Sequence, residues 1–195
     1  MQVLSWASHR PGLVTTNRVV WREVRNADLT PDLDVPAWLA DELAKEGLAD
    51  AVAFVTSRNI QRNHRTSIAI GDASVDCLVT LGLGNAERVG RRVSEQAKVA
   101  GTINILAVVE PGLSETAMIE AISIATEART LALVEAERVL PTGIATGTGT
   151  DCIAIASPHG ETLYAGKHTD VGEALGKAVY DAVSRATKEW IEERG

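Results

Sequence analysis

Short apolar runs of strand length come in groups along this chain instead of alternating with helices. They are rich in β-branched or small apolar residues and are bounded by polar residues, glycine or proline, at 19–24, 51–56, 66–70, 74–81, 102–109 and 152–156. A doubly wound fold would instead alternate each strand with a helix. The grouping predicts an α+β layered fold with a mixed or mostly antiparallel sheet.

Three segments carry helix signals. Pro36 suits the first turn of a helix that starts at Asp34 or Val35 and ends at Gly47, and Ser114 can cap a longer helix that runs to about Val139. A last helix begins after Thr169. The two long helices carry apolar stripes that we expect to pack on the sheet: Met118, Ala121, Ile122, Ala125, Ala128 and Ala132 on one, and Val171, Leu175, Val179, Ala182, Val183, Ala186 and Ile191 on the other. The polar piece 87–98 is predicted to be a loop or a short helix.

Composition narrows the class of protein. With 195 residues, 45% of them hydrophobic, we expect a single domain over 1–195. The net charge of −7 argues against nucleic acid and against an anionic membrane surface, and the longest basic stretch, 58–65, holds only three arginines and one histidine. No long apolar span or leader-like start is present, so we expect a cytoplasmic protein. The oligomeric state stays open, a homo-oligomer included.

Several kinds of site are disfavoured. Cys77 and Cys152 each lie in a strand-like apolar run, where a small buried thiol is the ordinary interpretation and a disulfide is not expected. The four histidines have no close His or Cys partner at the spacing of metal ligands, and neither an HExxH helix nor a GxSxG elbow occurs. We therefore expect no metal ligands and no elbow-type serine hydrolase.

Two polar clusters flank the run 152–156, one at 145–151 and the other at 164–169. We expect them at opposite ends of a hairpin or at neighbouring loop tips. Successive backbone N–H groups of Thr146, Gly147, Thr148, Gly149 and Thr150 could cradle an anion, although the lysine of a P-loop is missing. The alternative is a tight turn in which Asp151 binds its own backbone.

Ionisable and amide side chains near these clusters have two interpretations each. His168 could be a general base if Asp151 orients it, or an exposed residue before a helix. Glu127 could act with it, or be a solvated helical residue. Asn85 could donate to an oxyanion or only adopt a turn conformation. Thr102 and Asn104 share one face of a strand, which lines either the core or a cleft.

Five ordered segments resemble the adenosylcobinamide amidohydrolase family of cobalamin salvage. They cover most of the chain outside its first third, at 79–86, 101–105, 125–130, 145–151 and 164–169 with Gly172 and Glu173. The resemblance implies hydrolysis of the amide that joins the aminopropanol arm to the corrin ring, which gives adenosylcobyric acid. The substrate is then a corrinoid whose cobalt belongs to it, and no cofactor of the protein is required.

For that reaction we expect His168 as the base, oriented by Asp151 or Glu127, with Lys167, Asn85 or the glycine-loop N–H groups stabilising the oxyanion. Thr148 is the less favoured nucleophile, because nothing in the sequence places a base beside it. The expected substrate-binding residues are Asn85, Thr102, Asn104, Thr146, Gly147, Thr148, Gly149, Thr150 and Tyr164. A corrinoid-binding protein without catalysis and a hydrolase of another amide remain alternatives.

Overall fold

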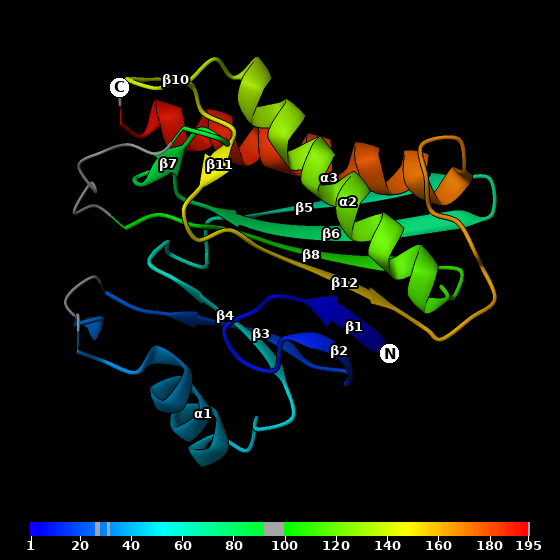
Figure 1. Cartoon of the computed structure of the whole chain (residues 1–195), viewed down its shortest axis with the longest axis horizontal. Coiled ribbons are helices and arrows are strands. Elements are labelled where there is room, and N and C mark those ends of the chain that lie inside the picture. Colours follow the sequence, from blue (N-terminus) through cyan, green and yellow to red (C-terminus); the bar gives the residue numbers. More distant parts are fainter. Residues whose placement is uncertain (26–27, 31, 92–99, 195) are drawn as a thin grey trace.

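A central sheet of six strands organises the protein (Figure 1). We describe it from a computed structural model that covers residues 1–25, 28–30, 32–91 and 100–194. In spatial order the strands are β2 (Gly12–Thr15), β1 (Gln2–Ser5), β12 (Cys152–Ser157), β8 (Ile103–Glu110), β6 (Ala73–Leu81) and β5 (Asn63–Ile70). Only β12 and β8 pair in parallel, and the other neighbours are antiparallel. The predicted α+β fold with a mixed, mostly antiparallel sheet is confirmed.

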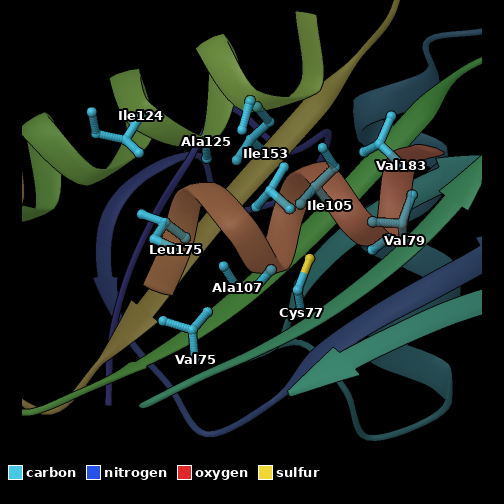
Figure 2. Close-up of a cluster of buried hydrophobic side chains, with 14 of the residues drawn as sticks. Val75, Cys77, Val79, Ile105, Ala107, Ile124, Ala125, Ile153, Leu175 and Val183 are labelled. Atoms are coloured by element: carbon cyan, nitrogen blue, oxygen red, sulfur yellow. The ribbon is translucent and has the colours of Figure 1, made fainter. Parts of the chain in front are cut away.

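Two long helices cover one face of the sheet. They are α2 (Glu115–Glu135), capped by Ser114, and α3 (Asp170–Glu192), capped by Thr169. Figure 2 shows side chains of the buried cluster between this sheet face and the helices, with Val79 of β6, Ile105 of β8 and Leu175 of α3 among them. Small residues on α2 let the helix approach the sheet closely.

The opposite face carries a second layer. β3 (Val19–Glu23) and β4 (Val52–Thr56) pair in parallel, and Phe54 packs with Val3 and Ala154 of the six-stranded sheet. Outside them lies α1 (Val35–Lys45), whose first turn holds Pro36 and whose N-cap is Asp34, as predicted. α1 buries Leu39 and Leu43 against Ala53 of β4. The order of layers is thus α2/α3, the six-stranded sheet, β3/β4 and α1.

Short strands complete the structure at one end of the sheet. β7 (Ala86–Glu87) pairs with β11 (Gly147–Thr148), and β9 (Val139–Leu140) pairs with β10 (Gly143–Ile144). The β7–β11 ribbon ties the loop before β12 to the segment that follows β6, and so it fixes the position of residues 146–151.

Some local predictions need correction. α2 ends at Glu135 and not near Val139, because Val139 enters the β9–β10 ribbon. Ile191 on α3 is 39% exposed, whereas its neighbour Trp190 is buried under the guanidinium groups of Arg138 and Arg194. Most of the segment 87–98 lies outside the described residues. Cys77 and Cys152 lie in β6 and β12 and are unpaired, as predicted.

Candidate active site

The two polar clusters lie at opposite ends of β12. Asp151 directly precedes the strand, and the loop 164–169 follows it, so that the two are seen at opposite ends of the sheet in Figure 1. Six strand residues span about 20 Å. β12 pairs with β1 and β8, so the predicted hairpin between the clusters does not form, and the alternative of neighbouring loop tips is wrong as well.

The cluster that precedes β12 is built around the carboxylate of Asp151. The backbone N–H groups of Thr148 and Ile103 donate to it at 3.0 and 3.1 Å, the hydroxyl of Thr148 donates to Oδ1, and Arg129 of α2 forms an ion pair with Oδ2. The side chains of Asp151 and Arg129 are only 8% and 12% exposed. We call residues 146–151, with Asn85, Thr102 and Arg129, the glycine-loop site.

Burial sets the electrostatics of this carboxyl group. It raises the pKa of Asp151 above the ordinary value, although the charge of Arg129 and the hydrogen bonds from Thr148 and Ile103 oppose the shift. A carboxylate that is costly to keep charged is a better proton acceptor than an exposed one. Asp151 therefore combines a fixed position with an increased affinity for a proton.

Amide and hydroxyl groups form a second network at the loop tip. The Thr150 hydroxyl donates to the carbonyl of Gly101 at 2.8 Å and accepts from Asn85 Nδ2 at 3.4 Å. Because a hydroxyl has one proton, this pattern fixes which end of the Asn85 amide faces Thr150. The Thr102 hydroxyl donates to the carbonyl of Thr150 at 2.7 Å. The other end of Asn85, Oδ1, is buried and has no hydrogen-bond partner within the described residues.

Three of the expected binding residues hold the backbone in place. Asn104 is buried and donates to the carbonyl of Val55, so it joins β8 to β4. The Thr146 hydroxyl accepts from the N–H of Val89, which secures the β7–β11 ribbon. Gly147 leaves no room for a side chain, because a Cβ there would lie 2.2 Å from Arg129 Nη1. Gly149 and Thr150 are the fully exposed members of the loop, and Thr148 is partly exposed.

The second cluster surrounds the loop 164–169. Lys167 forms an ion pair with Glu127 of α2, and both side chains are more than half exposed. His168 and the exposed Tyr164 line a cavity of about 460 Å³, and Lys167 also lines a neighbouring groove of about 880 Å³ between α2 and α3. The His168 ring forms no hydrogen bond with any residue that the structure describes.

The predicted pairing of Asp151 with His168 is not found in this geometry. The carboxylate of Asp151 is occupied by Arg129, Thr148 and Ile103 just before β12, whereas His168 lies in the loop after β12, directly before the N-cap of α3. Of the two carboxylates predicted to orient His168, only Glu127 lines the same cavity. In contrast, the structure brings Thr148 and Asp151 together, and the predicted alternative, a turn in which Asp151 binds its own backbone, is confirmed by the Thr148 N–H; the contact with the Thr148 hydroxyl was not predicted.

Other chemistries can be compared with the described residues. Among them, no three or more His, Cys, Asp and Glu side chains are grouped to hold a metal ion, and no helix is long and apolar enough to cross a membrane. Burial and the nearby Asp151 charge raise the pKa of the Cys152 thiol to about 11. A thiolate is therefore scarce at neutral pH, so Cys152 is a poor nucleophile.

Comparison with known proteins identifies the family. The adenosylcobinamide amidohydrolase family matches residues 1–195. The chain belongs to this family. It is 31% identical over 170 residues to an adenosylcobinamide amidohydrolase of Methanosarcina mazei. This match covers 81% of this chain and 75% of that protein. It is also 40% identical over 90 residues to an uncharacterised protein of Methanocaldococcus jannaschii, covering 44% of this chain and 35% of that protein.

Membership of the adenosylcobinamide amidohydrolase family confirms the predicted enzyme class, a hydrolase that acts on an amide C–N bond of a corrinoid. It also decides against a corrinoid-binding protein without catalysis.

Sequence reasoning missed two side chains of the site. Arg129 lies in one of the segments that carry the family resemblance, but its partner Asp151 is distant in sequence. The indole Nε1 of Trp6 donates to the carbonyl of Asp151 at 2.6 Å, and no sequence motif pointed to this residue.

Proposed function

We propose that the protein hydrolyses the aminopropanol amide of adenosylcobinamide at the glycine-loop site. The observation that carries this placement is the hydrogen bond from the Thr148 hydroxyl to the buried carboxylate of Asp151. Within the described part of the chain two other hydroxyls donate to carboxylates, Ser67 to Asp76 and Tyr180 to Glu135, and both pairs are exposed. A carboxylate that is shielded from water and held by several donors is preorganised and more basic than an exposed one, which suits it to activate a hydroxyl.

In the proposed reaction Thr148 is the nucleophile and Asp151 the base. Asp151 takes the hydroxyl proton as Thr148 Oγ1 attacks the amide carbon, and the carbonyl π electrons move to oxygen. Asn85 Nδ2, which has a second N–H besides the one donated to Thr150, stabilises that oxyanion. The C–N bond then breaks, the proton on Asp151 passes to the departing amine, and water cleaves the ester to release the corrinoid acid.

Arg129 has a positioning role in this scheme. Its cation holds Asp151 in place and opposes the rise in the pKa of the carboxyl that burial causes. The indole Nε1 of Trp6 donates a hydrogen bond to the backbone carbonyl of Asp151. Both contacts keep the carboxylate aligned with Thr148.

The test is hydrolysis of adenosylcobinamide followed by mass analysis for adenosylcobyric acid. Thr148→Val keeps the shape of the side chain but removes the hydroxyl, and should lower kcat by roughly 10²-fold or more. Thr148→Ser keeps a hydroxyl and should retain activity within about tenfold. Thermal unfolding of each variant separates loss of chemistry from loss of fold. Full turnover by Thr148→Val would remove Thr148 from the mechanism.

The same assay decides the alternative in which His168 is the base with Glu127 or Lys167. His168→Ala and Glu127→Gln alter exposed side chains at the far end of β12, so we expect turnover within a few-fold of the parent. If His168→Ala is inactive while Thr148→Val is active, the reaction belongs to the 164–169 cluster. Tyr164, an expected binding residue, is then part of that site.

The finer expectations about cofactors and partners are part of this proposal. Turnover should persist in EDTA, since no metal cofactor is expected. A loss of turnover that a divalent ion restores would contradict this.

The basic stretch 58–65 offers few free charges to nucleic acid, because Arg58, Arg62 and His64 pair with Glu189 or Glu193 of α3. We also propose a cytoplasmic location, and light scattering in solution will determine whether a homo-oligomer forms.

A further inference from the structure

A small pocket lies beside the glycine-loop site, between the end of the six-stranded sheet and the β3/β4 layer. Its volume is about 230 Å³. Thr150 joins the two: its side chain lines the pocket, and its N–H donates to Thr148 Oγ1 at 3.4 Å. Thr102 and Asn85 also line the pocket. A ligand group bound in the pocket would therefore contact residues that neighbour Thr148.

The pocket is lined by both hydroxyl-bearing and apolar residues. Ser8 and Ser57 are partly buried on its surface, and neither hydroxyl has a hydrogen-bond partner within the described residues. Val24, which is 5% exposed, and Val55 contribute methyl groups. Two free hydroxyls beside apolar carbon are suited to a small ligand that itself carries a hydroxyl and a methyl group.

Size decides which part of the substrate can enter. Pockets for drug-sized molecules measure roughly 300–1,000 Å³, so 230 Å³ is too small for a corrin macrocycle. It is ample for a short amino-alcohol of about five heavy atoms. The macrocycle must stay outside, and only its amide arm can reach past the loop tip.

We infer that this pocket, which we call the arm pocket, binds the amino-alcohol arm and selects for its hydroxyl group. The inference rests on the proposed function. Ser57 and Ser8 bind the hydroxyl of the arm, Val24 and Val55 contact its methyl group, and the amide carbon comes to lie beside Thr148. After cleavage the amine leaves from the arm pocket while the corrinoid acid remains on the outer surface.

The experiment compares two amides of adenosylcobyric acid, one with aminopropanol and one with propylamine, on the parent and on Ser57→Ala. For the parent, kcat/KM should be about fivefold higher with the hydroxyl-bearing arm, since one hydrogen bond contributes about 1 kcal/mol. Ser57→Ala should lose most of that preference and keep its rate on the propylamide. Ser123→Ala, an exposed serine on α2, is the matched control and should keep the preference.

A second variant keeps the inference testable through binding alone. Ser57→Leu fills the arm pocket and should weaken binding of adenosylcobinamide, measured by calorimetry, while adenosylcobyric acid, which lacks the arm, binds as to the parent. Equal arm preference in parent and Ser57→Ala, or equal weakening of both ligands by Ser57→Leu, would overturn the inference. If the parent hydrolyses neither amide, the proposed function itself fails.

Discussion

Gly147 shows how closely the glycine-loop site is packed at the level of single residues. A Cβ at this position would lie 2.2 Å from Arg129 Nη1 and 2.7 Å from Asp151 Oδ2, inside the ion pair. Gly147→Ala should therefore separate Arg129 from Asp151, lower stability by about 1–3 kcal/mol and reduce kcat at least tenfold. Gly149→Ala is the control, because its nearest neighbour is Asn85 Nδ2 at 3.8 Å. Urea unfolding and turnover measure both effects, and equal behaviour of the two variants would contradict the packing argument.

Arg129 provides a residue-scale prediction about pH. Arg129→Met removes the cation and leaves a buried carboxyl group, which should lower stability by about 3–5 kcal/mol near pH 7. Burial alone raises the folded-state pKa of Asp151 above its unfolded value, so the variant is relatively more stable below that value and loses stability as pH rises. The deficit relative to the parent should therefore shrink towards about pH 4. Urea unfolding across this range, with exposed Lys177→Met as control, tests it.

The glycine-loop site could be predicted from the sequence in part. The positions of Asn85, Thr102 and the loop 146–151 follow from where strands end, and these residues do meet. A turn in which Asp151 binds its own backbone was one of two predicted alternatives, but its burial beside Thr148 could not be inferred, because Arg129 and the N–H of Ile103 come from distant parts of the sequence. The predicted pairing of His168 with Asp151 is wrong because a strand of about 20 Å separates two residues that are close in sequence.

At the scale of elements, two glycines on α3 have opposite roles. A Cβ on Gly172 would lie 2.0 Å from the carbonyl oxygen of Gly166, which is backbone and cannot rotate away. Gly172→Ala should displace the loop 164–169 and lower stability by about 1–3 kcal/mol. Gly176→Ala meets only Ile124 Cγ2 at 3.7 Å and should stabilise the helix by up to about 1 kcal/mol. Thermal unfolding compares the two; destabilisation by Gly176→Ala would show that α2 and α3 pack closer than described.

The end of α3 is joined to the β4–β5 connection by ion pairs, and these should titrate in acid. Hydrogen bonding and the charges of Arg58 and Arg62 lower the pKa of Glu193 from 4.5 to about 2. A lowered folded-state pKa stabilises the protein above pH 4.5, and this contribution is lost as pH falls towards 2. Glu193→Gln should lower Tm at pH 7, and the difference from the parent should vanish near pH 2. Glu192→Gln, in a weaker exposed pair with Lys188, should change Tm less at either pH.

The elements themselves were largely predictable, for identifiable reasons. α1, the β5–β6 hairpin, β8 and both long helices have local signals, namely Pro36, the turn at Gly71, the stop at Pro111 and the caps Ser114 and Thr169. The early end of α2 was missed because the β9–β10 ribbon takes over Val139. The order of the strands was not predictable, because β12 lies between the first and the middle strands of the chain through pairings that are distant in sequence.

At the scale of the whole molecule, the position of the β3/β4 layer determines the arm pocket. Residues of β3/β4 and the loops that follow, among them Val24, Val55 and Ser57, form its outer wall, and the end of the six-stranded sheet forms the inner one. The layer is held by Phe54, which is fully buried and meets Trp21 edge to face with ring centroids 5.0 Å apart. We therefore expect packing between the layers to set the width of the pocket.

Phe54→Leu should therefore impair the use of the arm more than the chemistry. It removes contacts between β4 and the six-stranded sheet and destabilises the protein by an amount on the order of 1–2 kcal/mol. Leu39→Val, a change on the other side of β4 against α1, should cause a comparable loss and is the matched control. With both assayed well below their Tm, Phe54→Leu should raise KM for adenosylcobinamide several-fold with little change in kcat, whereas Leu39→Val should alter neither. Equal KM values for the two variants would mean that the width of the arm pocket does not depend on how the layers pack.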